Sequence, residues 1–454
     1  MIPSPALDLA ERALGHAPPC DGAQAGVTAE RSLLLRFARS RPTQATGIDD
    51  LTVQMTVLRD GQTGSATTNG SGEDALAACA NAAGERAEAA ARAGGSGAYP
   101  GFPDPAPPRP SDGHDAETSR LDPAQGGAAL AAAFAVAAAR GVEAHGVWSA
   151  AEVQTAVAST EGVRVCERVT DAFAKVTCFA PGGRSGYASA AAVAATALDV
   201  RALAERAAAK ATLPGVLARL EPGEYPVVME AAAVGELLTW LGYTAFDGLA
   251  FAEGRSALAG RIGRRVSAPS INISDSPRYP GTLPRSFDAE GVPKRPLPLI
   301  QDGVAAGITH DTRSAALAGA SSTGHALEPG GSPWGALPTN LVMVGGGAGD
   351  EAELCSTIER GIYVTRLWYT NVVREKETLI TAVTRDGTFL IEHGELVRPL
   401  EDLRLTDSVL DILARAEALS ARTELTSEGE FYGRRYATGV VCPALRSASV
   451  RFTA

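Results

Sequence analysis

The histidines of this chain, on which a zincin-type metal site would depend, are few and widely spaced. A zinc site of the zincin type needs two histidines on one face of a helix, with a neighbouring glutamate that activates the metal-bound water. The sequence contains six histidines, which are His16, His114, His145, His310, His325 and His393. None is followed by glutamate, and none lies between His145 and His310. The histidines therefore predict that this chain does not bind zinc in that way.

A second chemistry, covalent catalysis, can be assembled on paper from Ser322, His325 and Asp311. A nucleophile needs an adjacent base and a group that orients the base. Thr323 and Cys442 are two further candidate nucleophiles. Because such sets arise readily in any chain with many polar residues, structural roles are the favoured interpretation of all five.

The segment LVMVGGGAGDEAEL (341–354) has the outline of a strand, a glycine-rich turn and the start of a helix, as in phosphate-binding loops. The GxGxxG pattern fails because Asp350 occupies its last position. Asp350 and Glu351 would also repel a phosphate from the positive end of the helix. The pattern therefore predicts a tight connection and not a nucleotide site.

Composition and charge argue against several classes of protein. The net charge of −11 is unlike that of a nucleic-acid surface, which needs clustered Lys and Arg. The alanine-rich run over 128–139 is shorter than the roughly 20 residues needed to cross a bilayer. Six scattered cysteines without a CxxC pair, and an N-terminus without signal-peptide features, predict a cytoplasmic protein with free thiols and no membrane partner.

Hydrophobic periodicity and turn residues predict an α+β fold with two domains, over 1–214 and 215–454. The N-terminal domain is expected to have α/β character, with an antiparallel sheet, long helices and a proline-rich connector over 99–123. Its expected elements are helices over 4–15, 72–93, 124–140 and 198–211, and strands over 33–39, 51–69 and within 147–180, with a hairpin turn at Asp60-Gly61. The C-terminal domain opens with a strand over 225–230 and a helix, and its short strands with glycine turns predict a strongly curved or barrel-like antiparallel sheet.

Several blocks of the C-terminal half resemble the TldD/PmbA family, in which two related subunits form a zinc-dependent peptidase. The blocks are GIYVTRLWYTN (361–371), TRDGTFLIEHGE (384–395), the DxEG bend (288–291) and the STG loop (322–324). TldD-type subunits carry an HExxxH motif on a helix near the middle of the chain. The resemblance places Thr239, Trp240 and Thr244 at the positions of the first histidine, the glutamate and the second histidine. Neutral hydroxyls are poor zinc ligands and an indole is no base, so the resemblance implies a TldE-like subunit without metal.

The resemblance also implies a partner and a role. A TldD-like subunit would carry the zinc, and this chain would supply walls, an interface and contacts to an extended peptide substrate by strand addition. The chain alone is expected to be catalytically inert. The candidate residues for lining a cavity or contacting substrate are Trp240, Tyr243, Ser322, Thr323, Gly324 and Arg385.

Two other functions stay open. Members of such a family could be recruited to hydrolyse or tailor a small-molecule or peptide intermediate in a biosynthetic pathway. A homodimer that only binds a ligand is the third interpretation. The gene neighbourhood would discriminate between the first two, and a chain that binds no partner but transforms a compound alone would favour the small-molecule role.

Overall fold

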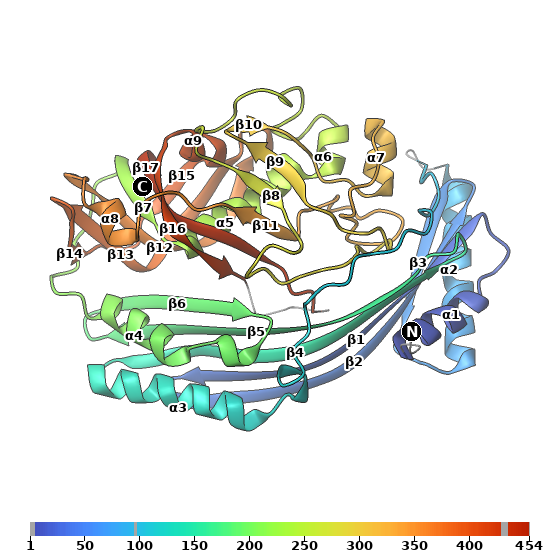
Figure 1. Cartoon of the computed structure of the whole chain (residues 1–454), viewed down its shortest axis with the longest axis horizontal. Coiled ribbons are helices and arrows are strands. Elements are labelled where there is room, and N and C mark those ends of the chain that lie inside the picture. The colour runs from blue at the N-terminus through green and yellow to red at the C-terminus, as the bar shows by residue number, and fades with distance from the viewer. Residues whose placement is uncertain (1–4, 95–97, 428–434, 454) are drawn as a thin grey trace.

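The computed structural model describes residues 5–94, 98–427 and 435–453. Two β-sheets form its main layers, and Figure 1 shows the long curved first sheet lying beneath the second. The first sheet has the strand order β3-β2-β1-β4-β5-β6, and all its pairings are antiparallel. Its strands are β1 (Gly22–Ala38), β2 (Arg41–Arg59), β3 (Gln62–Thr68), β4 (Glu143–Ser159), β5 (Arg164–Ala180) and β6 (Arg184–Ala192).

One face of the first sheet is apolar and is covered by helices. The two ends of this face carry separate clusters of buried alanine, valine and leucine side chains. The sheet can pack closely against its helices because most of these side chains are small. The covering helices are α1 (Pro5–Gly15) and α2 (Glu73–Ala93) at one end, and α3 (Pro123–Arg140) and α4 (Val200–Ala211) at the other.

The second sheet contains a closed ring of strands. Strand β7 pairs with β12 on one side and with β17 on the other, and the ring runs β7-β12-β13-β15-β17. Most pairings are antiparallel, but β7 with β12 and β11 with β17 are parallel. The strands are β7 (Gly223–Met229), β8 (Ile273–Asp275), β9 (Leu297–Gln301), β10 (Val304–Ala305), β11 (Asn340–Met343), β12 (Arg360–Arg374), β13 (Leu379–Glu392), β14 (Glu395–Pro399), β15 (Arg404–Ser408), β16 (Ala416–Thr426) and β17 (Gly439–Thr453).

The largest apolar core lies between these strands and the helix after β7. Leu237, Leu238 and Leu241 of that helix are fully buried in it. The helices of this half are α5 (Ala231–Leu241), α6 (Gly248–Ala252), α7 (Thr312–Ala318), α8 (Glu351–Cys355) and α9 (Val409–Ala414), with a π-helical turn at Gly242–Phe246 between α5 and α6.

The α+β class and the barrel-like second sheet predicted from the sequence are confirmed. The turn at Asp60-Gly61 is also as predicted, since both residues have positive φ, of 50° and 72°. The glycine-rich segment after β11 is a connection in which Asp350 accepts the backbone N–H of Glu353 and caps α8. The proline-rich connector has no helix or strand over 98–114, but Tyr99 and Phe102 are buried and pack on each other.

Candidate functional site

The helix at the centre of the family resemblance is α5, which runs directly into the π-helical turn. A hydroxyl in this helix can satisfy a backbone carbonyl one turn earlier. Thr239 donates to the carbonyl oxygen of Gly235 at 2.9 Å, and Thr244 donates to that of Trp240 at 2.8 Å. Thr239 is exposed, whereas Thr244 is buried in the turn. Both hydroxyl protons are therefore directed at the helix backbone.

The two aromatic residues of this helix end lie together. The ring centroids of Trp240 and Tyr243 are 5.7 Å apart, and the Trp240 indole donates a 2.9 Å hydrogen bond to Glu236 Oε1. Trp240 is partly buried, and Tyr243 is 40% exposed. The pair forms a partly exposed aromatic surface at the end of α5.

These residues do not fit a zinc ion. Zinc in proteins takes thiolate, imidazole or carboxylate ligands, and a threonine hydroxyl engaged with its own helix is none of these. Among residues 5–94, 98–427 and 435–453, no group of three or more His, Cys, Asp or Glu is placed to hold a metal ion. Cys442 is buried, and its thiol lies 3.3 Å from the carbonyl oxygen of Ala231. Burial raises the pKa of this thiol, so it is not a ready ligand.

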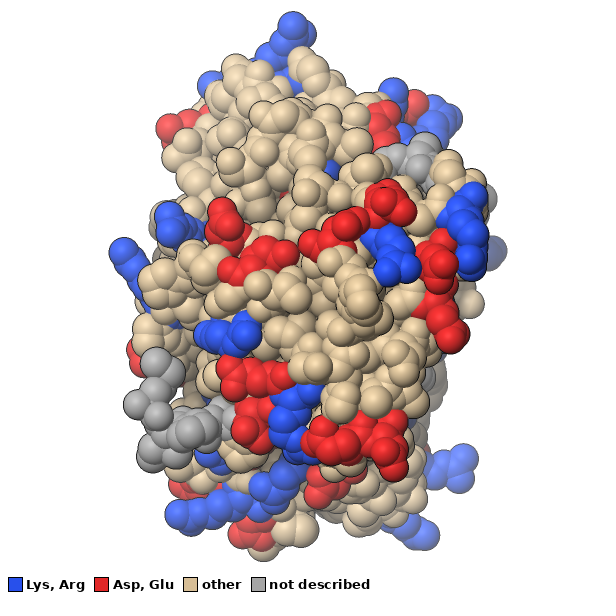
Figure 2. All heavy atoms as spheres, turned by 90° about the vertical axis from the view of Figure 1, so that its right-hand side faces the viewer, with Lys and Arg blue, Asp and Glu red and all other residues tan. Residues whose placement is uncertain are grey.

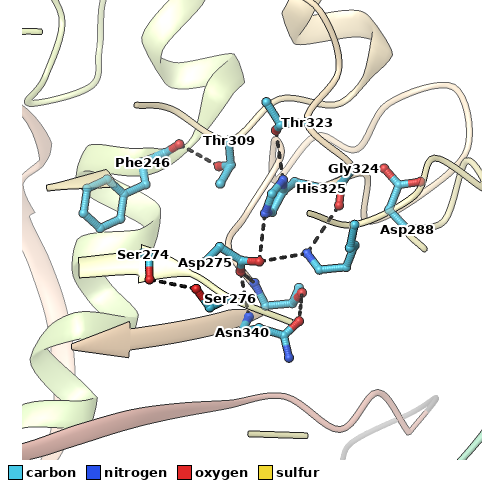
Figure 3. Close-up of polar contacts among 12 residues, drawn as sticks. Phe246, Ser274, Asp275, Ser276, Asp288, Thr309, Thr323, Gly324, His325 and Asn340 are labelled. Atoms are coloured by element: carbon cyan, nitrogen blue, oxygen red, sulfur yellow. Dashed lines mark hydrogen bonds and ion pairs between the residues drawn. The ribbon is translucent and has the colours of Figure 1, made fainter. Parts of the chain in front are cut away.

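The STG loop brings Thr323 and His325 against the end of β8. Thr323 Oγ1 lies 2.9 Å from His325 Nδ1, and His325 Nε2 lies 3.2 Å from Asp275 Oδ1 (Figure 3). Because Nε2 faces a carboxylate, we assign the ring proton to Nε2. The spacing resembles a hydroxyl–imidazole–carboxylate relay, but His325 and Asp275 are fully buried. A substrate has no access to that imidazole.

A buried lysine completes this cluster. Lys294 Nζ lies 3.2 Å from Asp275 Oδ1 and 3.3 Å from the carbonyl oxygen of Gly324, and its side chain is fully buried. Burial alone would raise the pKa of Asp275, but the charge of Lys294 and the contact with His325 lower it well below its usual range. Burial and Lys294 also lower the pKa of His325. The cluster is a buried ion pair that joins the loops around β8, in which Asp275 Oδ1 and His325 Nε2 make charge contacts but no hydrogen bond of good geometry.

The Ser/His/Asp set considered from the sequence is not assembled. Ser322 donates its hydroxyl to the carbonyl oxygen of His310 at 3.3 Å, and Asp311 caps α7 by accepting the backbone N–H of Ser314. The imidazole of His325 has Thr323 and Asp275 as partners instead. The sequence offered only a weak signal for Asp275, as the end of a short strand, and none for Lys294.

Within the described residues, one edge of strand β12 lacks a partner strand over part of its length, and this stretch is its free edge. It pairs with β13 along its length, but β7 accompanies it only from Ile362 to Val364. Beyond that point four large apolar side chains are exposed, which are Trp368 (43%), Tyr369 (76%), Val372 (37%) and Val373 (50%). Tyr369 lies in a bulge with a φ of 57°, which is unusual for an aromatic residue. An exposed apolar edge is a template for pairing with another chain.

Arg385 lies on the neighbouring strand β13, exposed and opposite Arg366 in the β12–β13 register. Arg366 stacks on the rings of Tyr187 and Trp368 and forms an ion pair with Asp386. Arg385 therefore lies on the paired side of β12, across that strand from its free edge. It is on a different strand from the aromatic pair of α5 and from the STG loop.

A cavity of about 40 Å³ lies between the polar face of the first sheet and the loops of the C-terminal half. None of the six candidate contact residues from the sequence lines it, although Asp288 and Ala289 of the DxEG bend do. Its lining includes Thr28, Thr52, Gln54, Thr155, Glu167, Arg285, Phe287 and Arg435.

Comparison with known proteins gives the family. The PmbA/TldA metallopeptidase C-terminal domain matches residues 222–454, the central domain matches 119–213, and domain 1 matches 23–87. The chain belongs to the PmbA/TldD metallopeptidase family. The resemblance drawn from the sequence is thereby confirmed.

Curated members of the PmbA/TldD family with similar sequences are named metalloproteases. A metalloprotease of Synechocystis sp. is 28% identical over 223 residues, covering 49% of this chain and 46% of that protein. A TldD homologue from Haemophilus influenzae is 27% identical over 238 residues, which cover 50% of this chain and 47% of that protein. The chain thus spans about half the length of these relatives.

Solved structures of PmbA/TldD relatives share the whole fold. TldE from Thermococcus kodakarensis has a TM-score of 0.85 at 19% identity, covering 98% of this chain and 99% of that one. A Thermotoga maritima protein, described as a candidate modulator of DNA gyrase, has a TM-score of 0.81 at 20% identity. The match covers 95% of this chain and 96% of that one. At these identities the likeness establishes the fold.

Two surface properties bear on partners. On the side of the molecule in Figure 2, basic and acidic side chains are intermixed and do not gather into one basic strip. In the part of the chain that the structure describes, every helix is too short or too polar to span a membrane.

Proposed function

We propose that this chain is a non-catalytic, TldE-like subunit that pairs with a TldD-like zinc subunit. The pair would form a metallopeptidase that acts on unstructured or modified peptides, with zinc held by the partner. The six cysteines are free thiols, which supports a reducing compartment such as the cytoplasm.

The observation that carries this proposal is the chemistry of α5. The positions that match the metal motif hold two hydroxyls that donate to their own helix and an indole that donates to Glu236. A metal-bound water needs a carboxylate base and basic ligands, and the three matched positions offer neither, while Glu236 of the same helix accepts the indole N–H of Trp240. Family membership without the metal chemistry is the expected property of a supporting subunit.

The free edge of β12 supports a role in holding extended chains. Backbone N–H and C=O groups on an unpaired edge can bind an extended peptide of any sequence, and exposed apolar side chains add contact area. Trp368 and Val373 supply such side chains here. A peptide bound in this way would be presented to the partner's zinc without any base from this chain.

The test is co-expression with a TldD-like protein from the same genome, followed by co-purification, zinc analysis and hydrolysis of an unstructured peptide. We expect one zinc per pair, and cleavage only when both chains are present. Stoichiometric zinc in the purified single chain, with peptidase activity lost on chelation, would overturn the proposal. A pair that ignores peptides but converts a small-molecule intermediate would point instead to biosynthetic tailoring.

The β12 edge has its own variant in this assay. The double substitution Trp368→Ala and Val373→Ser is expected to raise KM for the peptide and leave the zinc content of the pair unchanged. Ile262→Ser, at another exposed apolar position, is the matched control and should leave KM unchanged. An unchanged KM in the double variant would remove the edge from substrate binding.

A further inference from the structure

A row of threonine hydroxyls crosses the polar face of the first sheet. Thr28 on β1 is paired directly with Thr52 on β2 and with Thr155 on β4. Gln54 lies two residues along β2 from Thr52 and therefore on the same face, opposite Gly26. All five residues line the cavity beneath the C-terminal half.

These polar side chains have unused hydrogen-bonding capacity. Among the residues that the structure describes, none donates a side-chain hydrogen bond to, or accepts one from, Thr28, Thr52, Gln54 or Thr155. The side-chain oxygen and nitrogen atoms of these residues are not fully buried, so they reach the open space of the cavity. Polar groups in such a place need a polar partner.

The charged groups of the same cavity already have partners. Arg285 pairs with Glu167 at 3.4 Å, and Arg435 pairs with Asp171 at 2.9 Å. Asp288 accepts three backbone N–H groups, from Glu290, Val292 and Ala326. The groups that remain for a ligand are therefore neutral donors and acceptors.

We propose that this cavity is a second peptide-contact site, which binds a neutral amide or hydroxyl group of an extended polypeptide between the first sheet and the C-terminal half. The proposal rests on the proposed peptidase role and adds a substrate preference to it. The carboxamide of Gln54 can pair with another amide through one donor and one acceptor, and each threonine can do either.

The size of the cavity fits one such group. A volume of about 40 Å³ accommodates roughly three water molecules, since each needs about 10–15 Å³ of this kind of volume. That space suits the side chain of a serine, asparagine or glutamine and is small for a sugar ring. Phe287, Val153 and Val157 supply apolar walls for the aliphatic part of such a side chain.

Gly26 gives a direct way to block the site. A Cβ at this position would meet no atom within 4 Å, and the residue has no positive φ. Gly26→Val should therefore fill the cavity floor without strain in the backbone. Thr28→Val combined with Thr155→Val instead keeps the cavity shape and removes two hydroxyls.

The experiment measures binding of a fluorescent, unstructured peptide rich in Ser, Asn and Gln to the intact chain, by anisotropy. Both variants are expected to raise Kd by about tenfold, since one or two neutral hydrogen bonds are lost or excluded. Thr43→Val, at an exposed position of β2 outside the cavity, is the control and should leave Kd unchanged. Thermal unfolding of each variant confirms an intact fold.

The outcomes separate this site from the proposed function. Equal Kd values for the wild type and both variants, or no binding to the wild type, would overturn the site, even if the pair with the zinc subunit cleaves peptides normally. A Kd that responds to both variants supports the site, even if no zinc partner binds. Binding of an oligosaccharide in place of the peptide would reassign the cavity.

Discussion

The phenol of Tyr99 donates a 2.9 Å hydrogen bond to Oε1 of Glu290. This contact fastens the proline-rich connector to the DxEG bend of the C-terminal half, and both side chains are buried. The other carboxylate oxygen of Glu290 accepts the backbone N–H of Thr312 at 3.0 Å and its hydroxyl at 2.5 Å. Glu290 therefore links the connector, its own bend and the start of α7. Asp288 and Asp311 add negative charge to this buried position.

This contact makes stability depend on pH. Burial, followed by the charge of Asp288, raises the pKa of Glu290 to about 8 from 4.5. A carboxyl with a raised pKa contributes stability that is fully present below pH 4.5 and is lost as the pH rises through about 8. We expect the free energy of unfolding to fall between pH 5 and 9, and Glu290→Gln to flatten that fall. Urea titrations at several pH values measure it, with the exposed Glu328→Gln as control. An equal fall in both variants would contradict the assignment.

The second prediction concerns Glu230, the residue just before α5. It accepts hydrogen bonds from Tyr363 at 2.7 Å and from Thr365 at 3.2 Å, and Lys210 of α4 lies 2.5 Å away. Lys210→Met should cost up to about 3–5 kcal/mol, because it removes the nearer cation from a buried carboxylate and leaves only Arg206, at 3.6 Å. Adding Glu230→Gln should recover part of that loss. A double-mutant cycle in urea measures the coupling, and strictly additive losses would argue against it.

The third prediction is a steric one at Gly335. A Cβ there would lie 1.9 Å from Oδ1 of Asp247, and the φ of the glycine is 79°. Asp247 accepts the backbone N–H groups of Leu249 and Ala336, so it cannot move without losing them. Gly335→Ala should destabilise the fold by more than about 2 kcal/mol. Gly347→Ala, where a Cβ meets nothing within 4 Å, is the control and should be nearly neutral.

The fourth prediction concerns the buried hydroxyl–imidazole pair. Thr323 Oγ1 contacts both His325 and the backbone of His310, and His325 is closed to solvent. A fluorophosphonate probe should therefore leave Ser322 and Thr323 unlabelled, in the isolated chain and in the pair. Intact-mass analysis detects any adduct. Stoichiometric labelling at either residue would reopen covalent catalysis.

Local features of this fold could be read from the sequence because neighbouring residues determine them. The turn at Asp60-Gly61 needs two positive φ angles, which Asp and Gly tolerate. Helix α2 begins and ends within a residue of the predicted range because glycines flank it on both sides. Strand β1 is much longer than the predicted 33–39, since it begins at Gly22. Its first half carries few large apolar residues, as its polar face is buried against the C-terminal half.

The contacts of the candidate site could not be predicted from neighbouring residues in the sequence. Asp275 meets Lys294 and His325 only because loops from distant parts of the chain converge on β8. The row made by Thr28, Thr52 and Thr155 depends on the register of three strands. Neither relationship has a periodic signature in the sequence. The sequence could supply the expectation that Thr239, Trp240 and Thr244 share one helix, and all three lie on α5 or the π-helical turn that follows it.

The closed ring of the second sheet has a consequence for biosynthesis. The opening strand β7 pairs with β17, where Gly223 lies opposite Phe452. During translation, the edge of β7 that pairs with β17 therefore stays unpaired until the residues between these two strands have left the ribosome. Partly made chains with unpaired edges are prone to aggregate. The yield of folded protein should depend on chaperones that shield β7 until synthesis reaches β17.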